Sequence, residues 1–165
     1  MRRLTLIRHA KSSWKDKSLR DFERPLNKRG RQNAQEMGSR LRQHRFQPDM
    51  MLTSPARRAL ATAQAIAAAT GWPTERLILE AQLYEADLAT LFTIVHGLDD
   101  DWNHVVLFGH NPTFTEFANE LADAGIENIP TCGVVDLELA IGRWSQVEAK
   151  SARMVDFDFP KKEPD

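Results

Sequence analysis

Hydrophobic and polar residues follow two different periods along this chain. Short continuous apolar runs are typical of buried strands, whereas apolar residues three and four positions apart are typical of amphipathic helices. The apolar runs predict strands at residues 4–7, 50–53, 77–79, 105–108, 134–139 and 144–149. The helical spacing predicts helices over residues 54–70, 88–95 and 112–121, and one that begins at Asn27 and includes Leu41.

Capping residues mark where these helices are expected to begin and end. Asn27 is a predicted N-cap, and Ser54 is another, with Pro55 at the first helical position. Pro112 suits the first position of a further helix, and Gly71 is expected to end the second one.

Strands that alternate with helices predict the α/β class, an open and mostly parallel sheet with helices on both faces. Gly142 lies between the runs 134–139 and 144–149, so we expect these two strands to form a hairpin. No repeat, linker or break in composition divides the sequence, and we expect residues 1–165 to form one domain with a frayed tail from about residue 160.

Composition narrows the possible functions. The formal net charge of −1 argues against a nucleic-acid partner bound through a broad basic surface. Cys132 is the only cysteine, so no intrachain disulfide can form, which suits a reducing compartment. The apolar run after Met1 is too short for a signal peptide, and no stretch is long enough to span a membrane. We therefore expect a cytoplasmic protein with no membrane partner.

Polar residues that could bind a ligand or take part in a reaction follow three of the predicted strands. Arg8 and His9 end the first strand, His110 follows the strand at 105–108, and Arg57 and Arg58 lie in the first turn of the helix after the second strand. Ligands of open α/β sheets bind beyond the carboxyl ends of the strands, so these side chains are expected to converge. Helix N-termini and guanidinium groups both favour an oxyanion, phosphate above all.

The two histidines add chemistry to this expected phosphate site. A neutral imidazole can attack phosphorus and hold the phosphoryl group covalently, while a second imidazole donates to the transition-state oxygens. This scheme needs no metal and no cofactor. The Arg8-His9 pair alone is more often a solvated strand end, and a non-catalytic phosphate-binding module would need only the arginines.

Three segments at these strand ends resemble the motifs of the histidine phosphatase superfamily. They are "RHA" at 8–10, "SPARRALATA" at 54–63 and "GHNP" at 109–112. The register of the middle motif makes Arg58, rather than Arg57, the phosphate-binding arginine. Within the superfamily, "RHAKSSW", "RPLNKRG" and "GHNP" are most similar to SixA-type phosphohistidine phosphatases.

This resemblance implies a role for each matching residue. His9 would be the nucleophile that carries the phosphoryl group, and Arg8, Arg58 and His110 would complete the phosphate pocket, with Ser12 as a further phosphate or substrate contact. Leu83-Tyr84-Glu85 resembles the motif that carries the general acid in mutase-like members, so Glu85 is the candidate acid.

The resemblance also implies a substrate class. Only about fifty residues separate the second and third motifs, so we expect a minimal form of the fold with no large lid. An open pocket suits a phosphohistidine-bearing protein, with phosphate ion as product. A small phosphoester is the alternative substrate. Two positions depart from the wider superfamily pattern: Ala10 replaces a glycine, and Lys15 stands where many members have an asparagine.

Overall fold

The computed structural model describes residues 1–162, which form a six-stranded sheet in the order β3-β2-β4-β1-β5-β6. The strands are β1 (Arg2–Arg8), β2 (Met50–Thr53), β3 (Ile78–Leu79), β4 (His104–Gly109), β5 (Val134–Leu139) and β6 (Ala152–Asp158). The helices are α1 (Lys28–Gln43), α2 (Arg57–Thr70), α3 (Leu88–His96) and α4 (Thr113–Ala122). Strand β5 runs antiparallel to both of its neighbours, and the other pairings are parallel. The predicted α/β class with a mostly parallel sheet is confirmed.

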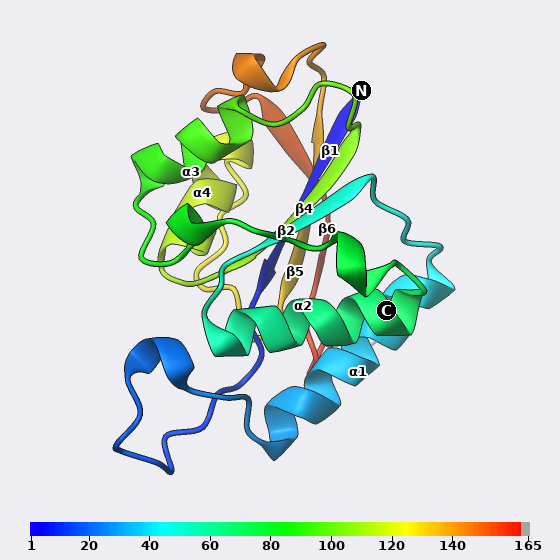
Figure 1. The fold of residues 1–165 in the computed structure, drawn as a ribbon. Helices are drawn as coiled ribbons and strands as arrows, with labels where there is room; N and C mark the ends of the chain where they lie inside the picture. Colours follow the sequence, from blue (N-terminus) through cyan, green and yellow to red (C-terminus); the bar gives the residue numbers. More distant parts are fainter. Residues whose placement is uncertain (163–165) are drawn as a thin grey trace.

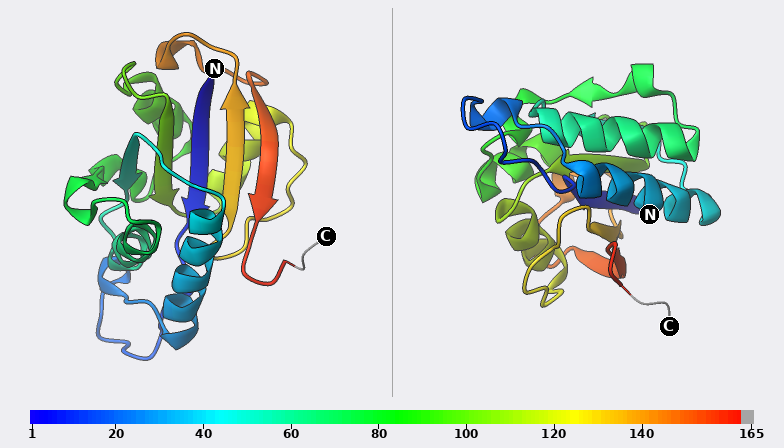
Figure 2. Two further views of the ribbon diagram at one scale, coloured as in Figure 1. Left: turned by 90° about the vertical axis from the view of Figure 1, so that its right-hand side faces the viewer. Right: turned by 90° about the horizontal axis from the view of Figure 1, so that it is seen from below.

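Two helices cover each face of the sheet (Figures 1 and 2). Helices α1 and α2 pack on one face, and α3 and α4 pack on the other. Neighbouring residues of β1 serve both layers, since Leu6 joins the core under α4 whereas Ile7 joins the core under α2. A strand buried on both faces reads as a continuous apolar run, which explains the pattern of the first strand.

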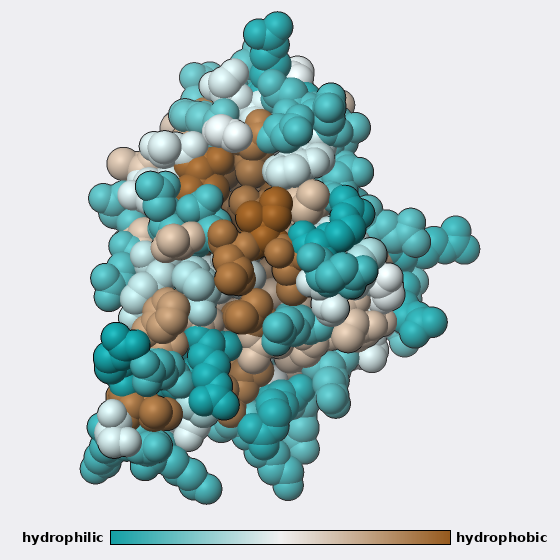
Figure 3. Space-filling view, in the orientation of Figure 1, coloured by the Kyte–Doolittle hydropathy of each residue, from teal (hydrophilic) through white to brown (hydrophobic). Residues whose placement is uncertain are grey.

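The connection from α2 to β4 is short, as predicted for a fold without a large lid. It holds two 3-10 turns, η2 (Thr74–Arg76) and η3 (Ala81–Leu83), together with β3 and α3. Strand β3 is an edge strand of two residues, and its Leu79 is 57% exposed. In the orientation of Figure 1, a space-filling view shows apolar residues at the centre of the molecular surface, with hydrophilic residues on either side of them (Figure 3).

The predicted strand at 144–149, and with it the tight hairpin around Gly142, is wrong. Residues 144–146 form the 3-10 turn η4 (Trp144–Gln146), and β6 pairs with β5 instead. Trp144 is fully buried, its indole N–H donates to the carbonyl of Trp102 (2.8 Å), and the Arg2 guanidinium lies 5.4 Å from its ring. Closing this end of the core with Trp144 keeps its backbone out of the sheet.

Two predicted helix boundaries, Asn27 before α1 and Gly71 after α2, are confirmed, and two predicted helix starts are wrong. Asn27 caps α1 by accepting a hydrogen bond from the Gly30 N–H (2.7 Å). Helix α2 begins at Arg57, after Ala56, so Ser54 is not its N-cap and Pro55 lies outside the helix. Pro112 is the N-cap of α4 rather than its first helical residue.

The chain beyond β6 is anchored by Arg40, which donates to the carbonyls of Phe159 (2.9 Å) and Pro160 (2.8 Å). Frayed ends were predicted from about residue 160, but Pro160 and Lys162 are held by hydrogen bonds, and residues 163–165 lie outside the described residues. Within residues 1–162, no helix has the length and apolar character needed to cross a membrane.

The first turn of α1 packs directly on the segment that follows β1. A Cβ on Gly30 would lie 2.1 Å from the carbonyl oxygen of Lys11, which accepts a hydrogen bond from the Asn27 N–H (3.0 Å). We expect Gly30→Ala to lower the free energy of unfolding by about 1–3 kcal/mol, because a backbone oxygen must move. Thermal unfolding should show a decrease in Tm of about 2–4 °C per kcal/mol.

Gly142→Ala is the matched control, because a Cβ at Gly142 would meet only Gln146 Oε1, at an ordinary 3.7 Å. Equal Tm values for the two variants would contradict the packing constraint at Gly30.

Candidate active site

The two motif histidines lie side by side at the carboxyl ends of β1 and β4. Arg8 is the last residue of β1 and pairs with Gly109, the last residue of β4. The His9 N–H donates to the carbonyl of Gly109 (3.0 Å), and the ring centroids of His9 and His110 are 5.2 Å apart. The strand register therefore brings together two imidazoles that are about a hundred residues apart in the sequence.

A hydrogen bond fixes the orientation of the His9 ring. Its Nδ1 lies 2.7 Å from the carbonyl oxygen of Ala10, which can only accept, so Nδ1 carries the proton and Nε2 keeps its lone pair. Burial lowers the pKa of His9 to about 4, and the positive charges of Arg58, Arg8 and Arg24 act in the same direction. His9 is therefore neutral at pH 7, with an unprotonated Nε2.

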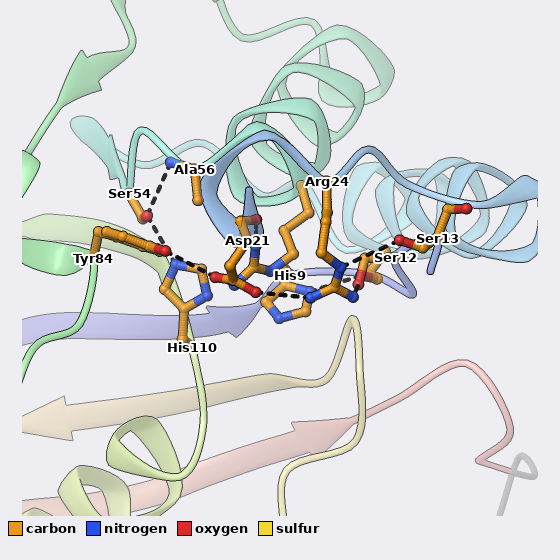
Figure 4. A network of polar contacts seen from close by, with 11 residues as sticks. His9, Ser12, Ser13, Asp21, Arg24, Ser54, Ala56, Tyr84 and His110 are labelled. Carbon is orange, nitrogen blue, oxygen red and sulfur yellow. Dashed lines mark hydrogen bonds and ion pairs between the residues drawn. The ribbon is translucent and has the colours of Figure 1, made fainter. Parts of the chain in front are cut away.

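His110 is held from the other side by Ser54. Its Nε2 lies 2.8 Å from Ser54 Oγ, which also accepts from the Ala56 N–H (3.2 Å) (Figure 4). The Ser54 hydroxyl donates its hydrogen to Nε2 of His110, so the proton of this imidazole lies on Nδ1. Nδ1 is buried without a partner among the described residues, and it faces His9 (Figure 4). Burial, followed by the nearby His9 and Arg58, lowers the pKa of His110 to about 3.

Arg58 reaches this cluster from the first turn of α2, whereas Arg57 is exposed. The Arg58 guanidinium is buried and donates both to the carbonyl (2.7 Å) and to the carboxylate Oδ2 (3.0 Å) of Asp21. Thr62, one turn further along, donates to the carbonyl of Arg58 and accepts from the Ala10 N–H (3.0 Å). One face of α2 thus fixes both Arg58 and the backbone next to His9.

Asp21 is the acidic centre of the cluster and was not predicted from the sequence. Besides Arg58, its carboxylate accepts from Arg24 Nη1 (2.9 Å) and from the Tyr84 hydroxyl (2.8 Å). Partial burial raises the pKa of Asp21, but the hydrogen bonds from Tyr84, Arg24 and Arg58 outweigh it and lower the pKa to about 2. Asp21 is therefore an anion at any ordinary pH.

Arg24, from the same loop as Asp21, is a second residue of the cluster that was not predicted from the sequence. Its side chain is buried, and it donates to Ser12 Oγ, to the Ser13 carbonyl (3.2 Å) and to Asp21. Ser12 therefore enters the cluster through Arg24. The guanidinium of Arg24 also lies 3.2 Å from the ring centroid of Trp14, which is itself 72% exposed.

Arg8 extends toward the loop before β5, where its Nη1 donates to the carbonyl of Ile129 (2.8 Å). Its Nε is buried without a partner among the described residues, and burial lowers its pKa. Glu85 lies outside the hydrogen-bonded network. It is exposed, has a left-handed backbone (φ 58°), and lines a cavity of about 220 Å³ together with His110.

One physical requirement could have indicated a residue such as Asp21, which was not predicted from the sequence. A buried guanidinium needs a carboxylate partner, so a predicted buried Arg58 calls for an acidic residue from another segment. Asp21 comes from the loop before α1, and no local pattern identifies it. Within residues 1–162, no three His, Cys, Asp or Glu side chains gather in a way that could hold a metal ion.

The placement of the two neighbouring arginines predicts unequal roles in phosphate binding. Arg58→Ala should weaken the binding of inorganic phosphate about 10- to 100-fold, because it removes a charge-assisted donor worth about 1.5–3 kcal/mol. Arg57→Ala is the matched control and should change the Kd less than about threefold, since this side chain is exposed. Isothermal titration calorimetry measures both, and a larger loss for Arg57→Ala would contradict the assignment.

Comparisons with known proteins identify the family of this chain. Residues 4–93 match the family model of the histidine phosphatase superfamily (branch 1). An uncharacterized protein of Mycobacterium tuberculosis is 33% identical over 165 residues, which cover 94% of this chain and 100% of the relative. An uncharacterized chloroplastic protein of Arabidopsis thaliana is 30% identical over 158 residues, 91% of this chain and 72% of the relative.

Solved structures extend the similarity over the whole fold. The putative phosphohistidine phosphatase SixA from Agrobacterium tumefaciens is 28% identical, with a TM-score of 0.79 over 94% of this chain and 96% of that chain. The putative SixA from Nakamurella multipartitia is 23% identical, with a TM-score of 0.81 over 98% and 97% of the two chains, and shows the shared fold. The chain therefore belongs to the histidine phosphatase superfamily, and its structure is of the SixA type.

Proposed function

We propose that this protein is a phosphatase that forms a covalent phosphohistidine on His9 and prefers phosphohistidine on a protein as its substrate. One observation carries the proposal: His9 is half-buried beside guanidinium groups and is held through Nδ1 by the Ala10 carbonyl, so that Nε2 is free to act as a nucleophile. Only side chains of this chain take part in the proposed chemistry, without a cofactor.

The reaction has two displacement steps at phosphorus. First, the Nε2 lone pair of His9 forms a bond to phosphorus while the bond between phosphorus and the leaving atom breaks, and the leaving group keeps the electron pair. A leaving imidazole needs little help from an acid at the breaking bond, because a proton on its other ring nitrogen allows it to leave as a neutral molecule. Second, a water oxygen attacks phosphorus, and the bond to His9 breaks with its electron pair returning to Nε2. One proton of the water passes to solvent, and the other stays on the hydrogen phosphate that is released.

The surrounding donors stabilise the transferring phosphoryl group. Arg58 and Arg8 supply guanidinium groups that suit phosphate oxygens. The Nδ1–H of His110, buried without a partner and facing His9, is a preorganised donor for a further oxygen. The bond from Ser54 holds this ring in place before substrate arrives.

The preference for a protein substrate rests on access and on leaving-group chemistry. Residues 71–103 build no large lid over the site, so a phosphorylated side chain on a protein surface has room to approach. Glu85 is exposed and has no hydrogen bond in the network, which suits a leaving group that needs no strong acid. The similarity to the Agrobacterium protein described as a putative phosphohistidine phosphatase supports the same substrate class.

A small phosphoester is the second candidate substrate, and one observation favours it. Glu85 and His110 line the same small cavity, so a carboxyl group is available near the reacting atoms to protonate an alkoxide. A non-catalytic phosphate-binding module is the least supported alternative, because phosphate binding alone needs the arginines and gives no role to a free His9 Nε2. We propose the cytoplasm as the compartment, and neither nucleic acid nor a membrane as partner.

Trapping the intermediate tests the proposed function. With a ³²P-labelled phosphohistidine substrate, rapid quenching at alkaline pH should leave label on His9, because phosphohistidine survives alkali. His9→Gln should lose both the label and turnover, while circular dichroism shows an intact fold. Label on another residue, or turnover of His9→Gln near the wild-type rate, would refute the nucleophile assignment.

A comparison of leaving groups decides between the two substrate classes. Glu85→Gln should slow hydrolysis of phosphohistidine only slightly, whereas it should slow an alkyl phosphate by the 10²–10⁴-fold that a positioned acid typically contributes. Steady-state rates on both substrates in the same pocket give the ratio directly. Equal losses would show that Glu85 acts on the phosphoryl group or the fold instead of on the leaving group.

A further inference from the structure

The charge of this chain is strongly polarised toward the candidate active site. Residues 11–31 contain eight Lys or Arg and three Asp or Glu, a net charge of +5, whereas the whole chain has −1. The remaining residues therefore have 14 basic and 20 acidic side chains, a net charge of −6. This segment follows β1 and projects beyond the end of the sheet where His9 lies (Figure 1).

Part of this positive charge lies at the start of a helix, where it lowers the stability of that helix. The first turn of α1 contains Lys28, Arg29 and Arg31 and no acidic residue. Cations at a helix N-terminus oppose the helix dipole, each by a few tenths of a kcal/mol. The helix dipole therefore does not favour these three cations, of which Arg31 also donates to the carbonyl of Leu26 (3.1 Å).

The basic segment also frames a groove beside the site. Its volume is about 690 Å³, and its walls are residues 12–15, residues 25–28 and Arg31. Trp14 stands at its rim with 72% of its surface exposed, stacked on the buried Arg24. Arg24 donates to Ser12 in the groove wall and to Asp21 in the site. A single side chain therefore lies between the groove and the candidate active site.

The cations that line the groove are available to a partner. The ion pairs that residues 11–31 make within the described residues involve Arg20 with Glu23, and Asp21 with Arg24 and Arg58. Lys15, Lys28 and Arg31 have no carboxylate partner there, and all three are exposed. Their charges are therefore not neutralised within residues 1–162.

We propose that this groove, with Trp14 and the cations Lys15, Lys28 and Arg31, docks an acidic stretch of the protein substrate next to its phosphorylated residue. The inference rests on the proposed function and names the chemistry of the partner. Carboxylates of the substrate pair with the three cations, and an apolar side chain packs on the open face of the Trp14 ring. Such pairing raises the rate of encounter and orients the phosphoryl group toward His9.

Two synthetic phosphohistidine peptides test the inference, one with glutamates and one with glutamines flanking the phosphorylated residue. At low ionic strength (about 10 mM), kcat/KM should be about tenfold higher for the glutamate peptide, and near 1 M salt the difference should vanish. The double variant Lys15→Glu, Lys28→Glu should lose this preference and keep the wild-type rate on free phosphohistidine. Glutamate suits the start of α1, so a folding defect is not expected from the second change.

Lys150→Glu is the matched control, because this lysine is exposed and lies just before β6, at the opposite end of the sheet. It should leave the preference for the glutamate peptide unchanged. Equal kcat/KM values for the two peptides, or competition by a uridine oligonucleotide but not by an unphosphorylated glutamate peptide, would overturn the docking surface. Absence of hydrolysis of both peptides and of free phosphohistidine by the wild type would instead refute the proposed function, so the two failures are distinguishable.

Discussion

The pairing of β1 with β4 is the constraint on which the candidate site depends. Arg8 pairs with Gly109 at the last position of both strands, so the residues that follow, His9 and His110, leave the sheet at the same point. A shift of one residue in this register would turn every side chain of β1 to the opposite face and would break both cores at once. The register is therefore fixed by burial on both faces, and the proximity of the two imidazoles follows from it.

Electrostatic balance is the second requirement of the site. Three guanidinium groups lie around two imidazoles, and burial together with these charges keeps both imidazoles neutral. Asp21 offsets part of the positive charge and holds Arg58 and Arg24 in place through its carboxylate. Positive charge therefore remains around His9, which keeps the lone pair on Nε2 that the proposed nucleophilic role requires.

The loop between β1 and α1 links this chemistry to the surface of the molecule. It contributes Asp21 and Arg24 to the site and exposes Trp14 and Lys15 beside it. Arg24 contacts both the groove wall and Asp21, so hydrogen bonds link the part of this loop in the site to the part at the surface. A nearly neutral protein thus has a net positive charge in the segment beside this site, where the proposed phosphorylated and acidic partner would meet it.

The sequence by itself determined the fold class, the cap at Asn27 and the strand ends at which Arg8, His9 and His110 lie, because local apolar runs and motif spacing encode these features. Only the tertiary structure decided the rest. Ser54 holds His110 instead of capping a helix, and Trp144 closes the core instead of continuing a strand. The places of Asp21 and Arg24 in the site could not be predicted from the sequence. The buried guanidinium of Arg58 pairs with the carboxylate that the fold brings near it, and that residue is close in space but not in sequence.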